Sequence, residues 1–198
     1  MANLSLTKRD VARELARRYS TMTHDELDIL ESVLVPKKYA KGEIILAEGQ
    51  TCSNIFWVVK GLVRQYYFKN KKEVTEYMAA ENTIVMSIES LFREQPSVQI
   101  IQALEPTLVY VLPKSELEAV AMRSVNIQIL YRKILEESLI ISQQRADMLR
   151  FESAQDRYQK LMKSAPQLVL RAPLVYIASY LQMTPETLSR VRTASLAG

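Results

Sequence analysis

Hydrophobic and polar positions along the chain follow three successive patterns. The first, up to Leu34, is helical: Val11 and Leu15 recur at helical spacing, and Thr23 with Glu26 forms a capping box for a second helix. The pattern therefore predicts two short helices at the start of the chain.

The second pattern, over residues 39–112, is a series of short β-rich runs separated by turn residues. Pro36 is expected to end the helical region before it. The runs are EIILA, NIFWVVK, LVRQYYF, EVTEYMA, VQIIQAL and TLVYVL. Lys69, Asn70 and Lys71 between two of them are typical of a hairpin turn. We therefore expect an antiparallel β domain.

The third pattern is helical again, with a capping box expected at Ser115 and Glu118 and no proline or glycine before Pro166. A helix over residues 125–151 would be a rod of roughly 40 Å. Its apolar stripe predicts pairing with a second copy of the chain through Ile127, Leu130, Ile134, Ile141 and Met148. The alternative is that the stripe packs on the β domain. Polar Ser138 and Arg145 interrupt it, which favours a loose helix pair.

Shorter helices are expected over residues 153–163 and 173–181, with a turn at Pro166 between them. In the second of these helices, Leu174, Ile177 and Leu181 form an apolar stripe, and a three-residue connection leads to a further helix. This spacing is that of a helix-turn-helix. We therefore divide the chain into residues 1–122, 123–151 and 152–198.

The last helix, in the stretch LQMTPETLSRVR, has a polar face suited to bases. Thr184 is a good N-cap and Pro185 fits the first helical position. Glu186 can accept a hydrogen bond from cytosine, and Arg190 can donate two to guanine. The alternative is that Glu186 and Arg190 form an ordinary surface ion pair.

Charge supports a nucleic-acid partner. The 198 residues carry a net charge of +4, and from Arg157 onward six basic residues face one acidic residue. No apolar run is long enough for a membrane span, and the first residues do not form a signal peptide, so a cytoplasmic protein is expected. One cysteine, Cys52, and one histidine give no basis for a metal, a cofactor or a catalytic site. We therefore expect no enzyme.

KGEIILAEGQTCSNIFWVVKGLVRQYY, followed by a long helix and YIASYLQMTPETLSRVR, resembles the cyclic-AMP receptor protein and FNR family of bacterial transcription regulators. The resemblance covers about residues 27–192. It implies an α+β fold with an antiparallel β-roll (a cyclic-nucleotide-binding-like, double-stranded β-helix or jelly roll), a dimerisation helix and a C-terminal helix-turn-helix domain. It also implies a homodimer acting on promoter DNA and RNA polymerase.

Carried over by position, the resemblance makes Glu186 and Arg190 base-reading residues and Thr184 and Thr187 phosphate contacts. We expect Arg192 to contact phosphate as well. Pro185 stands where the cyclic-AMP receptor has a base-reading arginine. The sequence ends soon after Arg192, so we expect a helix-turn-helix domain that lacks most of its wing.

The expected effector pocket departs further from the family. Relatives that bind a cyclic nucleotide have a Gly-Glu pair and an Arg-Ser pair there; these fall on Ser87 and Ile88, and on Ser97 and Val98. No arginine occupies the place that would face the phosphate, and Arg64 is the candidate substitute by another route. We therefore expect an effector other than cyclic AMP, or none.

Together these features predict a homodimeric DNA-binding regulator whose operator is roughly palindromic. The alternative is a ligand-sensing module that binds a cyclic nucleotide or another small metabolite and acts through protein contacts. The effector, the operator sequence, the regulated genes and the sign of regulation do not follow from the sequence.

Overall fold

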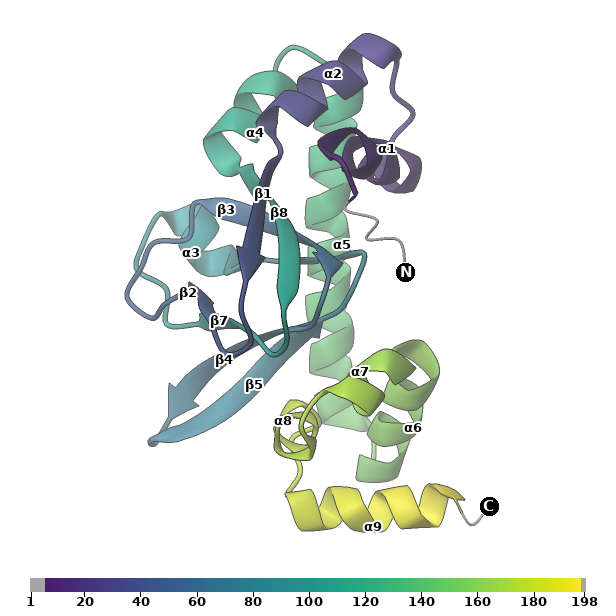
Figure 1. Ribbon diagram of the computed structural model, residues 1–198. Helices are drawn as coiled ribbons and strands as arrows, with labels where there is room; N and C mark the ends of the chain where they lie inside the picture. The colour runs from purple at the N-terminus through teal and green to yellow at the C-terminus, as the bar shows by residue number, and fades with distance from the viewer. Residues whose placement is uncertain (1–5, 197–198) are drawn as a thin grey trace.

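A computed structural model describes residues 6–196 of the chain. Figure 1 shows a β domain with helices packed at one end, a long helix running down its side, and a group of short helices below. Within residues 6–196, no helix combines the length and the apolar character that crossing a bilayer requires.

The β domain consists of two four-stranded antiparallel sheets. One has the strand order β1-β8-β3-β6 and the other the order β2-β7-β4-β5. The predicted antiparallel roll is therefore confirmed. The strands are β1 (Val35–Tyr39), β2 (Ile44–Leu46), β3 (Asn54–Lys60), β4 (Val63–Lys69), β5 (Lys72–Ala79), β6 (Thr83–Val85), β7 (Ile100–Ala103) and β8 (Thr107–Pro113).

Two features of the roll were not expected. Pro36 lies within β1, which is an edge strand that pairs only with β8; an edge strand tolerates a residue without a backbone N–H. The helical region does end before Pro36, as expected, with its second helix finishing at Val33, but the strands begin at Val35 and not at Tyr39. A short helix, α3 (Ile88–Arg93), follows β6.

Three helices close one end of the roll: α1 (Lys8–Tyr19), α2 (His24–Val33) and α4 (Lys114–Ala121). The capping box of Thr23 and Glu26 is confirmed at the start of α2. The box expected from Ser115 and Glu118 is wrong, because α4 begins at Lys114 and has no side-chain cap.

The long helix α5 (Val125–Phe151) has 27 residues and covers the range expected for it. The first part of its apolar stripe packs within the same chain and not, as predicted, against a second copy of the chain. Ile127, Leu130 and Ile134 are at most 1% exposed and belong to the core that α5 shares with the roll and its helices. A residue without accessible surface cannot contribute to an interface, so these three positions are corrected from dimer contacts to core residues of one chain.

The remaining stripe residues, Ile141 and Met148, are half-buried. The large apolar side chains that α5 leaves uncovered in its middle are instead Leu139 and Ile140, which are 70% and 54% exposed.

The C-terminal group consists of α6 (Ala154–Ser164), α7 (Pro166–Arg171), α8 (Leu174–Tyr180) and α9 (Pro185–Leu196). The turn expected at Pro166 is wrong: proline at the first position of α7 is compatible with a helix start. Leu62, Met78 and Ala80 of the roll belong to the same apolar core as Leu168 and Ile177 of this group. The roll and the helix-turn-helix group therefore share a core.

Candidate functional site

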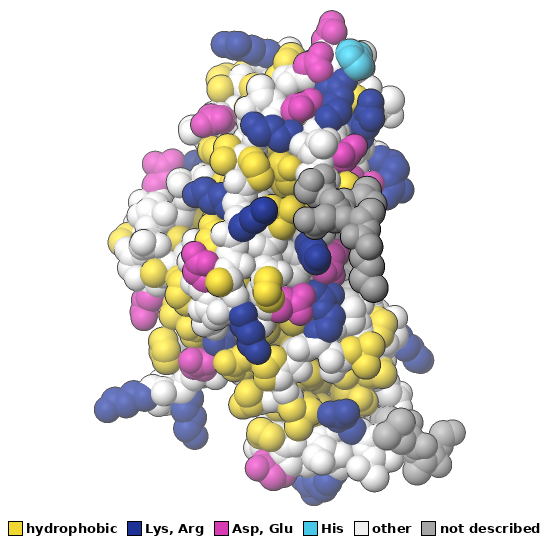
Figure 2. Space-filling view, viewed as in Figure 1, with side chains coloured by type: hydrophobic (Ala, Val, Ile, Leu, Met, Phe, Trp, Pro, Cys, Tyr) yellow, Lys and Arg dark blue, Asp and Glu magenta, His cyan; other side chains and the backbone are white. Residues whose placement is uncertain are grey.

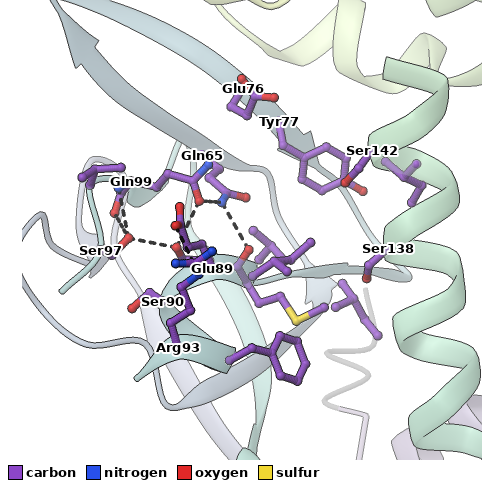
Figure 3. A pocket seen from close by; sticks show the side chains of 18 of the residues that line it. Gln65, Glu76, Tyr77, Glu89, Ser90, Arg93, Ser97, Gln99, Ser138 and Ser142 are labelled. Carbon is purple, nitrogen blue, oxygen red and sulfur yellow. Dashed lines mark hydrogen bonds and ion pairs between the residues drawn. The ribbon is translucent and has the colours of Figure 1, made fainter. Parts of the chain in front are cut away.

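A cavity of about 780 Å³ lies between the roll and α5. Figure 3 shows Gln65, Gln99 and Ser97 on the roll side and Ser138 and Ser142 on α5. Four of the five expected pocket residues line it, namely Ser87, Ile88, Ser97 and Val98, which lie in α3 or in the segments that flank it. The sequence thus located the cavity wall, although the contribution of Gln65 and Gln99 was not foreseen.

The inner polar wall of the cavity is a neutral hydrogen-bond network. Ser97 Oγ donates to Ser87 Oγ at 2.9 Å, and Ser87 Oγ donates to Gln99 Oε1 at 3.0 Å. Gln65 Nε2 donates to the same Gln99 oxygen at 2.6 Å and to the backbone oxygen of Met86 at 3.2 Å. Because all of these groups are uncharged, the network supplies no positive charge to an anion.

Charged side chains occur elsewhere in the lining, and each has an opposite charge near it. Arg93 Nε lies 3.5 Å from Glu89 Oε1, and both side chains are largely exposed. Arg145 Nε lies 4.0 Å from Glu76 Oε1. Each arginine among the described lining residues therefore has a carboxylate beside it, although the approach of Arg145 to Glu76 is too long for a hydrogen bond.

Arg64 does not line the cavity, so its assignment to the effector pocket is wrong. Its guanidinium is stacked between Tyr66 of β4 and Tyr176 of α8, at 3.8 and 3.7 Å from the ring centroids. Arg64 Nη1 also pairs with Glu73 at 2.7 Å. The side chain is 1% exposed and joins the roll to the helix-turn-helix group.

Two further arginines hold the same junction, and no pattern in the sequence predicted either role. Arg171 of α7 pairs with Glu81 at 2.7 Å and with Glu105. Burial would raise the pKa of Glu81, but hydrogen bonds from Arg171 and from the Gly61 N–H outweigh it and bring that pKa to about 2. The Arg171 guanidinium is correspondingly held protonated.

Arg145 of α5 is the third. Its guanidinium lies 4.1 Å from the ring centroid of Tyr180 of α8 and donates to the Thr75 oxygen at 3.4 Å. Its Nε and Nη1 are buried and have no hydrogen-bond partner among the described residues. Burial lowers the pKa of Arg145. The polar residue that was expected to interrupt a dimer seam thus contacts both the roll and α8.

The turn between α8 and α9 has the expected position. Gln182 adopts a left-handed conformation with φ 49°, and Met183 N donates to the Ala178 oxygen at 3.0 Å. Arg157 of α6 donates through Nε to the Leu181 oxygen at 2.9 Å. These bonds fix the direction in which α9 leaves α8.

Helix α9 buries one face and exposes the other. Leu188 is fully buried, whereas Glu186, Arg190 and Arg192 are exposed. Figure 1 shows α9 at the end of the molecule opposite α1 and α2. Glu186 and Arg190 do not form an ion pair in the described part of the chain, so the ion-pair interpretation finds no support.

The start of α9 is capped as expected, because Thr184 Oγ1 accepts from Thr187 N at 3.2 Å. Arg190 Nη2 donates to Thr187 Oγ1 at 3.3 Å. Hydrogen bonds from its own backbone N–H and from the Thr184 hydroxyl hold the pKa of Glu186 below its usual value. The face therefore presents an ionised carboxylate and a guanidinium one turn apart.

In residues 6–196, no group of three or more His, Cys, Asp and Glu side chains is placed to hold a metal ion. Cys52 is buried, and its thiol contacts the Asn54 oxygen.

Comparison with known proteins gives one family and several structures. Residues 36–124 match the family described as the cyclic nucleotide-binding domain. No curated protein matches the sequence. Among solved structures, FixK2 from Bradyrhizobium japonicum is 21% identical, with a TM-score of 0.70 over 82% of this chain and 84% of that one.

The catabolite activator protein of Thermus thermophilus is also 21% identical, with a TM-score of 0.56 over 91% of this chain and 85% of that one. The c-di-GMP-responsive regulator CLP of Xanthomonas campestris is 12% identical, with a TM-score of 0.66 over 88% and 92% of the two chains. At these identities the likeness shows a shared fold that extends from the roll through the C-terminal helices.

Proposed function

Because residues 36–124 match the cyclic nucleotide-binding domain and most of the chain shares the fold of FixK2 and of a catabolite activator protein, we propose that the protein is a DNA-binding transcription regulator of the Crp/Fnr type. The observation that carries the proposal is the exposed face of α9. Leu188 anchors the helix, and Glu186 and Arg190 extend from the other side with no ion pair between them. Such a face matches the donors and acceptors of a major groove.

The regulator acts as a homodimer on a roughly palindromic promoter site, where it meets RNA polymerase. The two chains pair along α5 through the face that carries Leu139 and Ile140, since these large apolar side chains are uncovered in one chain. The two α9 helices then enter successive major grooves about 34 Å apart. Thr184, Thr187 and Arg192 contact the phosphates beside them.

The cavity binds an effector other than cyclic AMP. A buried cyclic phosphate needs a cation, and the wall around Ser87 and Ser97 is neutral. Arg93 and Arg145 each have a carboxylate nearby. Tight binding of cyclic AMP in a calorimetric titration would contradict this part of the proposal.

A second candidate function is a ligand-sensing module that acts through protein contacts. The cavity of about 780 Å³ favours ligand binding and is compatible with either candidate. DNA binding distinguishes the two.

The test is a pair of substitutions on α9, measured by fluorescence anisotropy. Duplexes selected from random DNA serve as specific sites, and scrambled duplexes serve as random sites. Arg190→Ala is expected to weaken specific binding by about 1 to 3 kcal/mol and to relax preference at one base pair per half-site. Arg192→Ala is expected to weaken all sequences alike. Equal losses on specific and random DNA for both variants would refute the assignment.

A further inference from the structure

The free end of the β4–β5 hairpin is a cluster of positive charge. Lys69 pairs with Lys72 across the hairpin, and Asn70 and Lys71 connect them. All four side chains are exposed, and none of the three lysines has an ion pair among the described residues. The nearest acidic residue in sequence, Glu73, is already paired with Arg64 at 2.7 Å. We call residues 69–72 the basic tip.

The backbone of the basic tip favours glycine where it has lysine. Asn70 and Lys71 both have left-handed conformations, with φ 50° and 63°. Two-residue hairpin turns of this kind usually place Asn first and Gly second, because a side chain with φ above zero meets its own backbone. Lys71 adopts this strained conformation although its exposed side chain makes no packing contact that would offset the strain. A strained backbone position whose side chain makes no packing contact suggests that the charge of the side chain has a function.

The basic tip is held at a fixed place beside the helix-turn-helix. Thr75 N of β5 donates to Ser179 Oγ of α8 at 2.9 Å, and Arg64 of β4 is stacked on Tyr176 of α8. Ser179 lies five residues before the cap of α9 at Thr184. Lys72 lies three residues from Thr75, which is about 10 Å along a strand.

The hairpin therefore projects from its contact with α8, close to the start of α9. Figure 1 shows its free end extending away from the roll on the side of α8. Figure 2 shows basic side chains standing out from the surface there.

We propose that the basic tip binds the sugar-phosphate backbone of DNA beside the major groove that α9 enters. The proposal rests on the proposed function, because α9 must bring the duplex to this end of the molecule. A major groove is about 12 Å wide, so its bordering phosphates are within reach of a tip that lies about 10 Å beyond α8.

Lysine is suited to this contact, as a point charge on a long flexible stem. Residues 69–72 contain no apolar side chain that could form the core of a protein interface, which favours a phosphate backbone over an acidic protein surface.

The test compares two triple variants that remove the same charge. In the tip variant Lys69, Lys71 and Lys72 are replaced by Gln. In the control variant three exposed lysines at the other sheet are replaced by Gln, namely Lys37 and Lys38 of β1 and Lys41 just after it. Affinity for a selected and a scrambled duplex is measured over a series of salt concentrations. The tip variant is expected to lose affinity for both duplexes alike, and its salt slope should fall by about 1 for each lysine that contacts phosphate.

The single variant Lys71→Gly separates charge from folding, because glycine suits the turn. It should raise the thermal midpoint and still lower the salt slope. If the tip variant keeps the slope of the control variant while wild type binds DNA, the inference fails and the proposed function stands. If wild type binds no duplex, the proposed function fails.

A third outcome would identify a different partner. If the tip variant binds DNA like the control but no longer regulates transcription by purified RNA polymerase, the basic tip contacts protein and the inference is overturned.

Discussion

The cavity and the junction between the roll and the helix-turn-helix group receive adjacent residues of β4, and their buried polar side chains differ in charge. In the cavity, Gln65 joins a neutral network with Gln99. At the junction, its neighbour Arg64 is buried between two tyrosine rings, and Arg145 and Arg171 also cross between the two parts. The inner polar network of the cavity is thus neutral, whereas the junction contains cations; Arg145, which also lines the cavity, lies where the two regions meet.

This difference shows that burying a cation does not by itself indicate a ligand site. Each junction arginine contacts a tyrosine ring or carboxylates from the other part, so its charge is used within the chain. The three are not equally well satisfied, however. Arg171 bridges two carboxylates, whereas Arg145 has two nitrogens without a hydrogen-bond partner among the described residues. Substitutions can therefore rank the junction contacts.

The largest effect is expected for Arg64→Ala. It removes two cation-π contacts that are shielded from water and the partner of Glu73, so the free energy of unfolding should fall by about 3 kcal/mol. Urea denaturation measures it. Arg93→Ala, at an exposed arginine of the cavity mouth, is the control and should change the same quantity by less than about 0.5 kcal/mol. Similar losses of unfolding free energy for the two variants would contradict the claim that the junction arginine contributes more to stability than the cavity arginine.

A smaller loss of about 2 kcal/mol is expected for Arg171→Ala, because its ion pairs are only partly shielded from solvent. It should depend on pH. The pKa of Glu81 is lowered from 4.5 to about 2 in the folded chain, so its contribution is present above about pH 4.5 and is lost as the pH falls through about 2. Thermal midpoints of wild type and variant should therefore converge over this range. A gap that stays constant with pH would show that Glu81 is not the partner that matters.

The smallest effect is expected for Arg145→Met. Burying an arginine with two unsatisfied nitrogens is costly, and an apolar side chain of similar length recovers the packing on Tyr180. The free energy of unfolding should change by less than about 1 kcal/mol in either direction. A loss as large as that of Arg64→Ala would mean that the unpartnered nitrogens are better stabilised than their geometry indicates.

The parts of the fold that depend on local sequence were accessible before the structure. The strand runs, the helix over residues 125–151 and the turn before Pro185 all follow from spacing, caps and turn residues, which act within a few positions of the chain. The missed elements are those whose context is distant. Pro36 is tolerated in a strand only because β1 lies at the edge of its sheet, and the local sequence does not show which strands are edge strands.

Site residues show the same limit. Successive side chains of a strand point to opposite faces, so one position decides whether Arg64 or Gln65 enters the cavity, and the sequence alone does not say which. The stripe of α5 was recognised as a buried face, but periodicity cannot tell whether the covering surface belongs to the same chain. In this protein the covering surface belongs to the same chain, because Ile127 lies in the core that α5 shares with the roll.

The apolar core that Leu62 and Met78 share with Leu168 and Ile177 has a consequence for any attempt to take the molecule apart. Proteolytic cleavage after α5, or truncation of the chain there, would expose an apolar surface on the roll and a matching apolar surface on the C-terminal helices. Each fragment would tend to aggregate. The isolated helix-turn-helix piece is therefore a poor reagent for this protein, and the intact chain is the smallest unit expected to fold.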